Sequence, residues 1–167
     1  MARKHKTDSV GVKGFFRLKI VEDGPDGRPL IVGDSGWCEN LVTNDGFAKS
    51  VAACFAAVAG SSQVSHAALG TGTAPAVTAT LLDGEITDVA GARCATTGSI
   101  VASKTAQFVF TLASGVYTTT KTIQNVGLFQ TSTTNAGTLI AGNTYATSQL
   151  ASTQSVNGTY QIRFATA

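Results

Sequence analysis

The chain has 167 residues, of which 43% are hydrophobic and only 13% charged, and its formal net charge is +2. Soluble domains carry roughly 25% charged residues, so charge is scarce here while apolar content is ordinary. This balance excludes intrinsic disorder, which needs the opposite composition, and the length predicts a single domain able to bury a core.

The first residues are basic. Arg3, Lys4 and Lys6 could contact nucleic acid or an acidic surface, but we favour a solvated N-terminal tail. No apolar run follows them, and no apolar stretch reaches the roughly 18 residues needed to span a bilayer, so neither a secretory signal nor a membrane contact is expected. We expect a protein made in the cytosol.

Alternating residues predict a strand from Val10 to Val21. Apolar residues occupy one face, and the opposite face carries Lys13, Phe15, Arg17 and Lys19. Residues 22–28 are rich in Gly, Pro and Asp and predict a turn, and residues 30–32 and 37–42 continue as strands. We expect residues 1–36 to form an N-terminal arm or hairpin that attaches to a neighbouring subunit.

One motif inside this arm imitates an enzyme. Residues 33–36 (Gly-Asp-Ser-Gly) match the surroundings of the nucleophile in trypsin-like proteases. That chemistry needs a histidine base and a carboxylate in the order His, Asp, Ser, and only His5 precedes Ser35. We interpret residues 33–36 as a turn before Trp37.

A helix is predicted from Asp45 to Ala59. Thr43 or Asn44 can cap it, and Phe47, Val51, Cys54, Phe55 and Val58 recur at helical spacing before Gly60. The remaining positions are mostly Ala. We therefore expect the helix to pack against the sheet.

The next segment offers weak signals for phosphate and metal binding. Residues 70–73 (Gly-Thr-Gly-Thr) begin like a phosphate-binding loop, but neither a lysine nor a helix pattern follows. His66 has no second ligand close by in sequence, so a structural histidine is expected. Asp83, Glu85 and Asp88 could hold Ca²⁺ if a loop turned them inward, but a solvated loop is the preferred interpretation.

The three cysteines show no CxxC pair and no zinc spacing. We expect Cys38, in a strand, and Cys54, on the helix, to be buried as small apolar residues. An odd number leaves at least one free thiol or one intermolecular bond, and Cys94 is equally available for either. We therefore expect no catalytic residue, no cofactor and no metal site.

Short strands at regular spacing fill the second half. They are predicted at residues 64–69, 95–102, 106–112, 120–130, 138–141, 144–150 and 155–164, separated by turn residues. This pattern predicts a mainly β fold, an antiparallel β-sandwich or jelly roll with one helix near residues 45–59, in which residues 37–167 form the body of a single domain.

The second half is also nearly uncharged. Asp88 is the last acidic residue, and only Arg93, Lys104, Lys121 and Arg163 carry charge after it. Hydroxyl groups could keep this surface soluble, but we favour coverage by other subunits. Phe15, Trp37 and Tyr160 are spread over strands and do not cluster with basic residues, so no specific nucleic-acid groove is expected. Residues 157–159 match a glycosylation acceptor that needs secretion.

The order of these motifs resembles a group of small tailed-bacteriophage virion proteins, described as decoration, head-fibre or tail-fibre-like. Residues 40–47 lead into the helix, residues 68–75 lead to 80–86, and residues 123–129 precede a closing strand. The similarity covers about residues 38–164 and lies in turn and core patterns. It implies a non-enzymatic β-sandwich or jelly-roll subunit that works as an oligomer in a phage particle.

We therefore expect a virion structural protein, foremost a capsid decoration or cement protein that stabilises the outer shell. Its partners would be itself, as a trimer, and the major capsid protein or tail proteins. The alternatives are a tail component, such as a tube, adaptor or fibre-base subunit, and a carbohydrate-binding module for host recognition that depends on Trp37.

Overall fold

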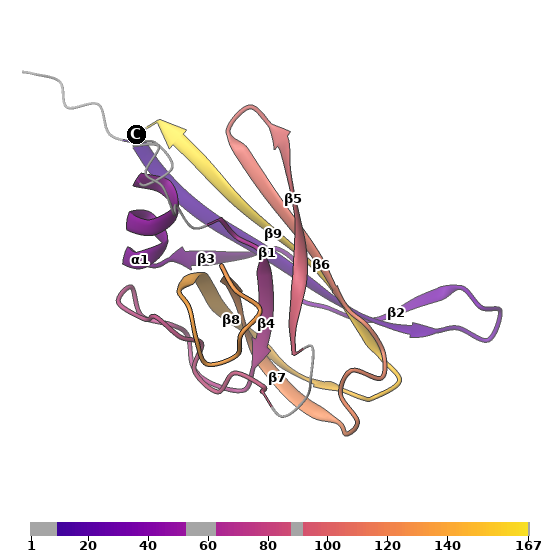
Figure 1. The fold of residues 1–167 in the computed structure, drawn as a ribbon. Helices are drawn as coiled ribbons and strands as arrows, with labels where there is room; N and C mark the ends of the chain where they lie inside the picture. The colour runs from indigo at the N-terminus through magenta and orange to yellow at the C-terminus, as the bar shows by residue number, and fades with distance from the viewer. Residues whose placement is uncertain (1–9, 53–62, 88–91, 167) are drawn as a thin grey trace, which may run out of the picture.

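The computed structural model describes residues 10–52, 63–87 and 92–166, and nearly all of its regular structure is β-strand (Figure 1). The mainly β class predicted from the sequence is confirmed. The elements are β1 (Val10–Asp23), β2 (Pro29–Asp34), β3 (Cys38–Val42), α1 (Asn44–Gly46), η1 (Phe47–Ala52), β4 (His66–Gly70), β5 (Arg93–Ala102), β6 (Thr105–Leu112), β7 (Lys121–Phe129), β8 (Leu139–Leu150) and β9 (Ser155–Thr166).

Eight strands close into an antiparallel barrel in the order β1-β3-β8-β7-β4-β5-β6-β9, with β9 pairing back to β1. The closing ladder runs from Val10 opposite Thr166 to Val21 opposite Ser155, so the first and last strands complete the ring. The prediction is thus confirmed at the level of a mainly β fold with one short helix, and the sheet is a closed barrel where a β-sandwich or jelly roll was expected. A sandwich packs two separate sheets face to face, whereas here one sheet curls until its ends meet.

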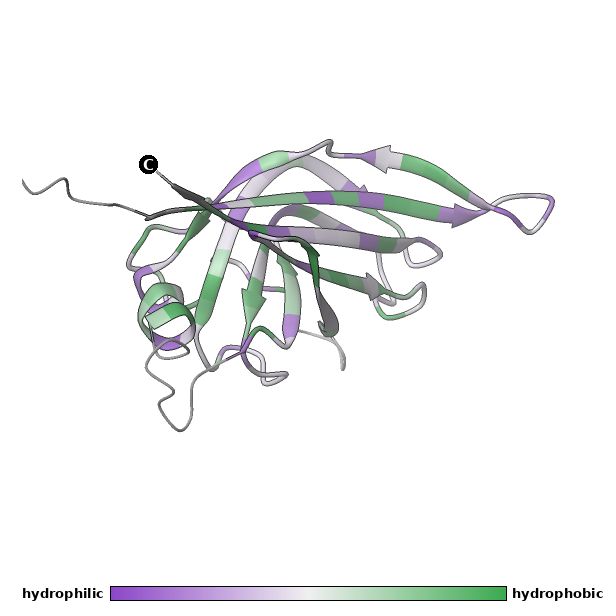
Figure 2. Cartoon of the chain, turned by 90° about the horizontal axis from the view of Figure 1, so that it is seen from above, coloured by the Kyte–Doolittle hydropathy of each residue, from purple (hydrophilic) through white to green (hydrophobic). Residues whose placement is uncertain are grey.

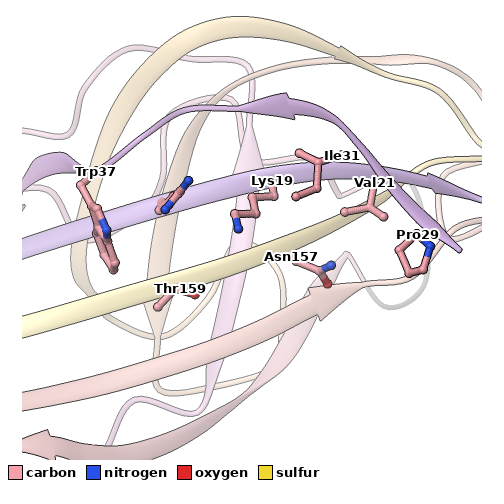
Figure 3. A pocket seen from close by; sticks show the side chains of 8 residues that line it. Lys19, Val21, Pro29, Ile31, Trp37, Asn157 and Thr159 are labelled. Atoms are coloured by element: carbon pink, nitrogen blue, oxygen red, sulfur yellow. The ribbon is translucent and has the colours of Figure 1, made fainter.

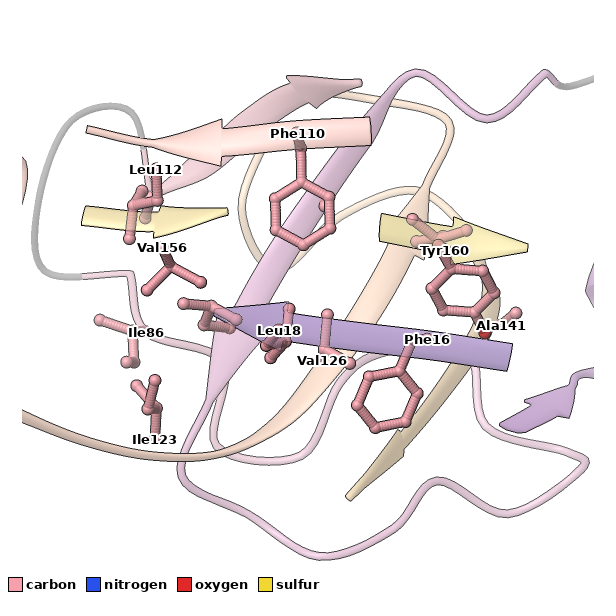
Figure 4. Close-up of a cluster of buried hydrophobic side chains, with 14 of the residues drawn as sticks. Phe16, Leu18, Ile86, Phe110, Leu112, Ile123, Val126, Ala141, Val156 and Tyr160 are labelled. Atoms are coloured by element: carbon pink, nitrogen blue, oxygen red, sulfur yellow. The ribbon is translucent and has the colours of Figure 1, made fainter. Parts of the chain in front are cut away.

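The barrel interior is filled by alternate residues of the surrounding strands (Figure 4). Phe16 and Leu18 of β1 face inward, as the alternating pattern predicted, and the ring of Phe16 stacks on Tyr160 of β9 with 6.3 Å between centroids. Each such buried side chain stabilises the fold by roughly 1.5–3 kcal/mol. The interior also contains Phe110, Leu112, Ile123, Val126, Leu128, Val156 and Ile162.

A smaller apolar cluster covers the outer side of β4 and β7. It consists of Ala68, Leu82, Phe129 and Leu139. Arg93 closes this cluster: its guanidinium lies 3.6 Å from the centroid of the Phe129 ring and forms a two-fold ion pair with Glu85, with N–O distances of 2.7 and 2.8 Å. Arg93 also donates to the carbonyls of Thr131 and Ala136, so one buried cation fastens two loops to the barrel wall.

The predicted helix is only partly present. Thr43 caps it as expected, because its Oγ1 accepts the Gly46 N–H at 3.0 Å, but α1 ends at Gly46 and continues as the π-helical segment η1. Residues 53–59 of the prediction lie outside the described residues. The prediction that the apolar side chains of the helix pack against the sheet is wrong for Phe47, which is exposed. The contact is made by buried Gly46 instead, where a Cβ would lie 2.1 Å from the Ile140 carbonyl oxygen.

The hairpin of β1 and β2 projects beyond the barrel (Figures 1 and 2). Strand β2 pairs only with β1 and carries three consecutive exposed apolar residues, Leu30, Ile31 and Val32. Polar residues form the connecting turn, where Gly27 adopts a φ of +73°. No helix in the described ranges has the length and apolar character needed to cross a membrane.

Candidate functional site

A trough of about 430 Å³ lies on the outer face of the sheet, where β2, β1 and β9 run side by side (Figure 3). Alternate residues of β1 form its floor, which explains why they share one face. Trp37 lies at one end of the trough and Pro29 at the other. We call it the outer trough; it is lined by Arg17, Lys19, Val21, Pro29, Ile31, Trp37, Asn157 and Thr159.

A bulge between β2 and β3 places Trp37 at the trough. Both strands pair with β1, and residues 35–37 form the irregular link between them. The Ser35 hydroxyl accepts the Leu18 N–H at 2.9 Å and donates to the Gly36 carbonyl at 2.8 Å, while Gly36 adopts a φ of +65°. These contacts leave the Trp37 side chain 47% exposed on the outer face.

Ser35 therefore has a structural role in the link between β2 and β3. Its hydroxyl is engaged with backbone groups on both sides, consistent with the turn expected from the sequence. His5, the only histidine preceding Ser35, lies outside the described residues. The other histidine, His66, is on β4 with its Nδ1 2.8 Å from Ser65 Oγ, and burial, with a smaller effect of Arg93, lowers its pKa.

Charge in the outer trough is only partly neutralised. Arg17 forms a bidentate ion pair with Asp34, in which the distance from Arg17 Nε to Asp34 Oδ1 is 2.9 Å. The Arg17 guanidinium and the Gly36 N–H lower the pKa of Asp34 to about 2, so this carboxylate stays ionised at neutral pH. Lys19 forms no ion pair with any residue that the structure describes. Its charge contributes to the lowered pKa of Asp34 without an ion pair, so its ammonium group can still pair with a ligand.

The outer face continues beyond the trough as a basic and amide-rich surface. Lys13 forms an exposed ion pair with Glu39 at 2.9 Å, and the Arg163 guanidinium covers the Phe15 ring at 4.4 Å from its centroid. Gln161 accepts from Arg163 at 2.7 Å. Folding gathers these basic and aromatic residues although their sequence spacing did not indicate a cluster; the signal available in the sequence was the charged face of β1.

The Gly-Thr-Gly-Thr loop is held in place by hydrogen bonds from the rest of the fold. Asp83 accepts both the N–H and the hydroxyl of Thr73 at 2.8 Å, and these bonds lower the Asp83 pKa. Asn125 holds the same loop by donating to the carbonyls of Thr73 and Asp83. Glu85 pairs with Arg93, so Asp83 and Glu85 have different partners and do not face a common site. Asp88 lies outside the described residues.

The cysteines that the structure describes do not pair. Cys38 and Cys94 are free thiols, and burial raises the pKa of Cys94 to about 11, which makes it a poor nucleophile at neutral pH. Cys54 lies outside the described residues. Within the described ranges, no three His, Cys, Asp or Glu side chains group in a way that could hold a metal ion.

No protein-family model, curated protein or solved structure matches this chain.

Proposed function

We propose that this chain is a non-enzymatic structural subunit that assembles through its exposed strand edges. The observation that carries the proposal is β2, an edge strand with Leu30, Ile31 and Val32 exposed by 52%, 52% and 45%. An unpaired apolar edge is a template for adding a strand from another chain. On the sequence resemblance alone, we further propose that such a subunit belongs to a bacteriophage particle.

A second edge offers the matching contact. β5 pairs with β4 only from Arg93 to Ala95, so its later half has no neighbour on that side among the described residues. It exposes Ile100 by 84% and Val101 by 48%. Pairing of β2 in one copy with β5 in the next would be a head-to-tail contact, and where the rotation between copies closes, such contacts form rings such as trimers.

In a phage particle this ring would act as a decoration or cement protein on the outer shell. Binding would bury apolar area across several copies and so stabilise the shell against outward pressure. A tail component built from the same contacts is the alternative. Cryo-EM of the native assembly separates the two: rings of this chain on the shell support the decoration role, and rings within the tail support the alternative.

The edge contact is tested by measuring oligomeric state with light scattering after size-exclusion chromatography. The wild type should be oligomeric, and either Val32→Asp or Ile100→Asp should shift it to monomer, because a charge would be buried unpaired in the interface. Leu81→Asp is the matched control, since Leu81 is 42% exposed and belongs to a loop and not to β2 or β5. A monomeric wild type, or equal disruption by Leu81→Asp, would contradict the proposal.

A further inference from the structure

We propose that the outer trough binds an acidic saccharide, with one sugar ring stacked on Trp37 and a carboxylate paired with Lys19. This is a binding function separate from strand-edge assembly. Its floor and polar wall belong to β1 and β9, and Pro29 and Ile31 of β2 line its far end, whereas assembly uses the free backbone edges of β2 and β5.

Trp37 has the features of a stacking platform. It is the only tryptophan of the chain and is 47% exposed, although a buried position would stabilise the fold by removing its large apolar ring from water. The bulge holds its backbone through the Ser35 hydrogen bonds, and Cys38 Sγ lies 3.6 Å from the Ser35 carbonyl oxygen. A backbone held in this way keeps the exposed indole at the trough, which lowers the ordering cost when a ligand ring covers it.

The charge of the trough selects an anionic ligand. Two cations and one anion face this region: Arg17 pairs with Asp34, and the charge of Lys19 acts on the same carboxylate without an ion pair, so one positive charge is in excess. Lys19 lies opposite Asn157 in the ladder between β1 and β9, so its ammonium group is beside the polar wall of the trough. A carboxylate bound there would gain an ion pair and would not have to break an existing one.

The polar wall supplies groups that can bind hydroxyls. Asn157 and Thr159 project from alternate positions of β9, opposite Lys19 and Arg17. Asn157 Oδ1 accepts the Thr111 hydroxyl at 2.8 Å, which leaves the amide nitrogen of Asn157 as a donor toward the trough. Each ring of a saccharide carries several hydroxyl groups, and these can donate to and accept from the polar side chains of this wall.

The far end of the trough is apolar. Val21, Pro29 and Ile31 line it, away from Trp37 (Figure 3). This end fits an apolar substituent, such as the methyl group of an N-acetyl function, on the neighbouring sugar. The volume of about 430 Å³ lies within the roughly 300–1,000 Å³ typical of small-molecule sites.

Single-stranded nucleic acid is the main competing anion, and the geometry disfavours it. Nucleic-acid platforms stack successive bases on successive aromatic rings. The trough offers one such ring, Trp37, because the nearby Phe15 is already covered by the Arg163 guanidinium. One stacked ring and one free ammonium suit an acidic sugar better than a chain of bases.

The test uses the full chain and oligomers of polysialic acid, which carry carboxylates and N-acetyl groups. Binding is followed by calorimetry and by the fluorescence of Trp37, the only indole present. We expect saturable binding that shifts Trp37 emission and weakens about tenfold in Lys19→Gln and in Trp37→Ala. Unchanged thermal unfolding of both variants verifies that they fold.

The matched control is Lys13→Gln, which removes one charge from the same strand and face outside the trough. It should leave affinity unchanged; an equal loss in Lys13→Gln and Lys19→Gln would indicate diffuse attraction and overturn the proposal. Absence of saturable binding, equal affinity for carboxyl-reduced polymer, or tighter binding of oligothymidylate would also overturn it. Measurement on the Val32→Asp variant keeps the result independent of assembly, since saccharide binding should persist there.

Discussion

At the scale of single residues, Asp34 connects the charge of the outer trough to pH. Its ordinary pKa is 3.8, and the ion pair with Arg17 and the Gly36 N–H lower it to about 2 in the folded chain. A lowered folded-state pKa means that the stabilising effect is complete above about pH 4 and is lost as pH falls toward 2. We predict that NMR titration of the Asp34 carboxyl gives a midpoint near 2.

The variant Arg17→Gln should raise this midpoint toward 3.8, because it removes the largest cause of the shift. Lys13→Gln, on the same strand but paired with Glu39, should leave it in place. A wild-type midpoint close to 3.8 would show that the Arg17–Asp34 pair does not persist in solution.

A second residue-scale prediction concerns the buried cation on the opposite wall. The side chains of Arg93 and Glu85 are 0% and 1% exposed, so removing one charge leaves the other buried without compensation. We expect Arg93→Met to lower the free energy of unfolding by about 3–5 kcal/mol. Urea denaturation measures the loss.

The double variant Arg93→Met/Glu85→Leu provides the comparison. It should be more stable than Arg93→Met alone, because no uncompensated charge remains, although the carbonyls of Thr131 and Ala136 still lose their donor. Equal stability of the single and double variants would show that the charge pair is not what fastens the two loops.

At the scale of elements, local patterns predicted the strands well but not their closure. The alternation from Val10 to Val21 and from Ser155 to Phe164 identified β1 and β9, because period two reflects one buried face. The ladder that joins them links residues about 150 positions apart, and no local pattern encodes it. β8 was predicted as two strands because Gly142 and Asn143 favour turns, whereas pairing with β7 keeps it continuous.

Because the pairing of β1 with β9 is long-range, the sequence did not predict most of the residues that line the outer trough. Its floor could be anticipated from the charged face of β1, and Trp37 was recognised as a possible sugar contact. Asn157 and Thr159 could not be assigned to it, since only the β1–β9 register places them opposite Lys19 and Arg17. Ser35 shows the reverse case: a catalytic-looking motif is a bulge, because turn residues and active-site loops share glycine and small polar side chains.

The pairing of β6 with β9 yields an element-scale prediction. Phe110 lies opposite Gly158, and a Cβ at Gly158 would come within 2.0 Å of the Phe110 ring. Gly158→Ala should therefore overpack the barrel and lower stability by about 1–3 kcal/mol, measured by thermal and urea unfolding. Adding Phe110→Leu, which removes the ring, should recover part of the loss; a double variant less stable than the sum of the two single changes would contradict this packing.

At the scale of the whole molecule, the barrel is closed by its two end strands. Val10 pairs with Thr166, so the described ends of the chain lie side by side, and β1 contributes to the core as well as to the projecting hairpin. The barrel therefore depends on the pairing of β1 with β9 and not on which residue starts the chain. Breaking the chain elsewhere at an exposed turn should cost little free energy of unfolding when residues 1 and 167 are joined.

We predict that a circular permutant joining Ala167 to Met1 and opened between Ser103 and Lys104 folds into the same barrel. Both residues are exposed in the turn from β5 to β6, so the new ends displace no core contact. Its circular dichroism should match the wild type, and its unfolding should remain one cooperative transition. Opening instead between Thr159 and Tyr160 would cut β9 at its contact with Phe16, and that permutant should lose cooperative unfolding. Equal stability of the two permutants would show that closure by β1 and β9 does not hold the barrel together.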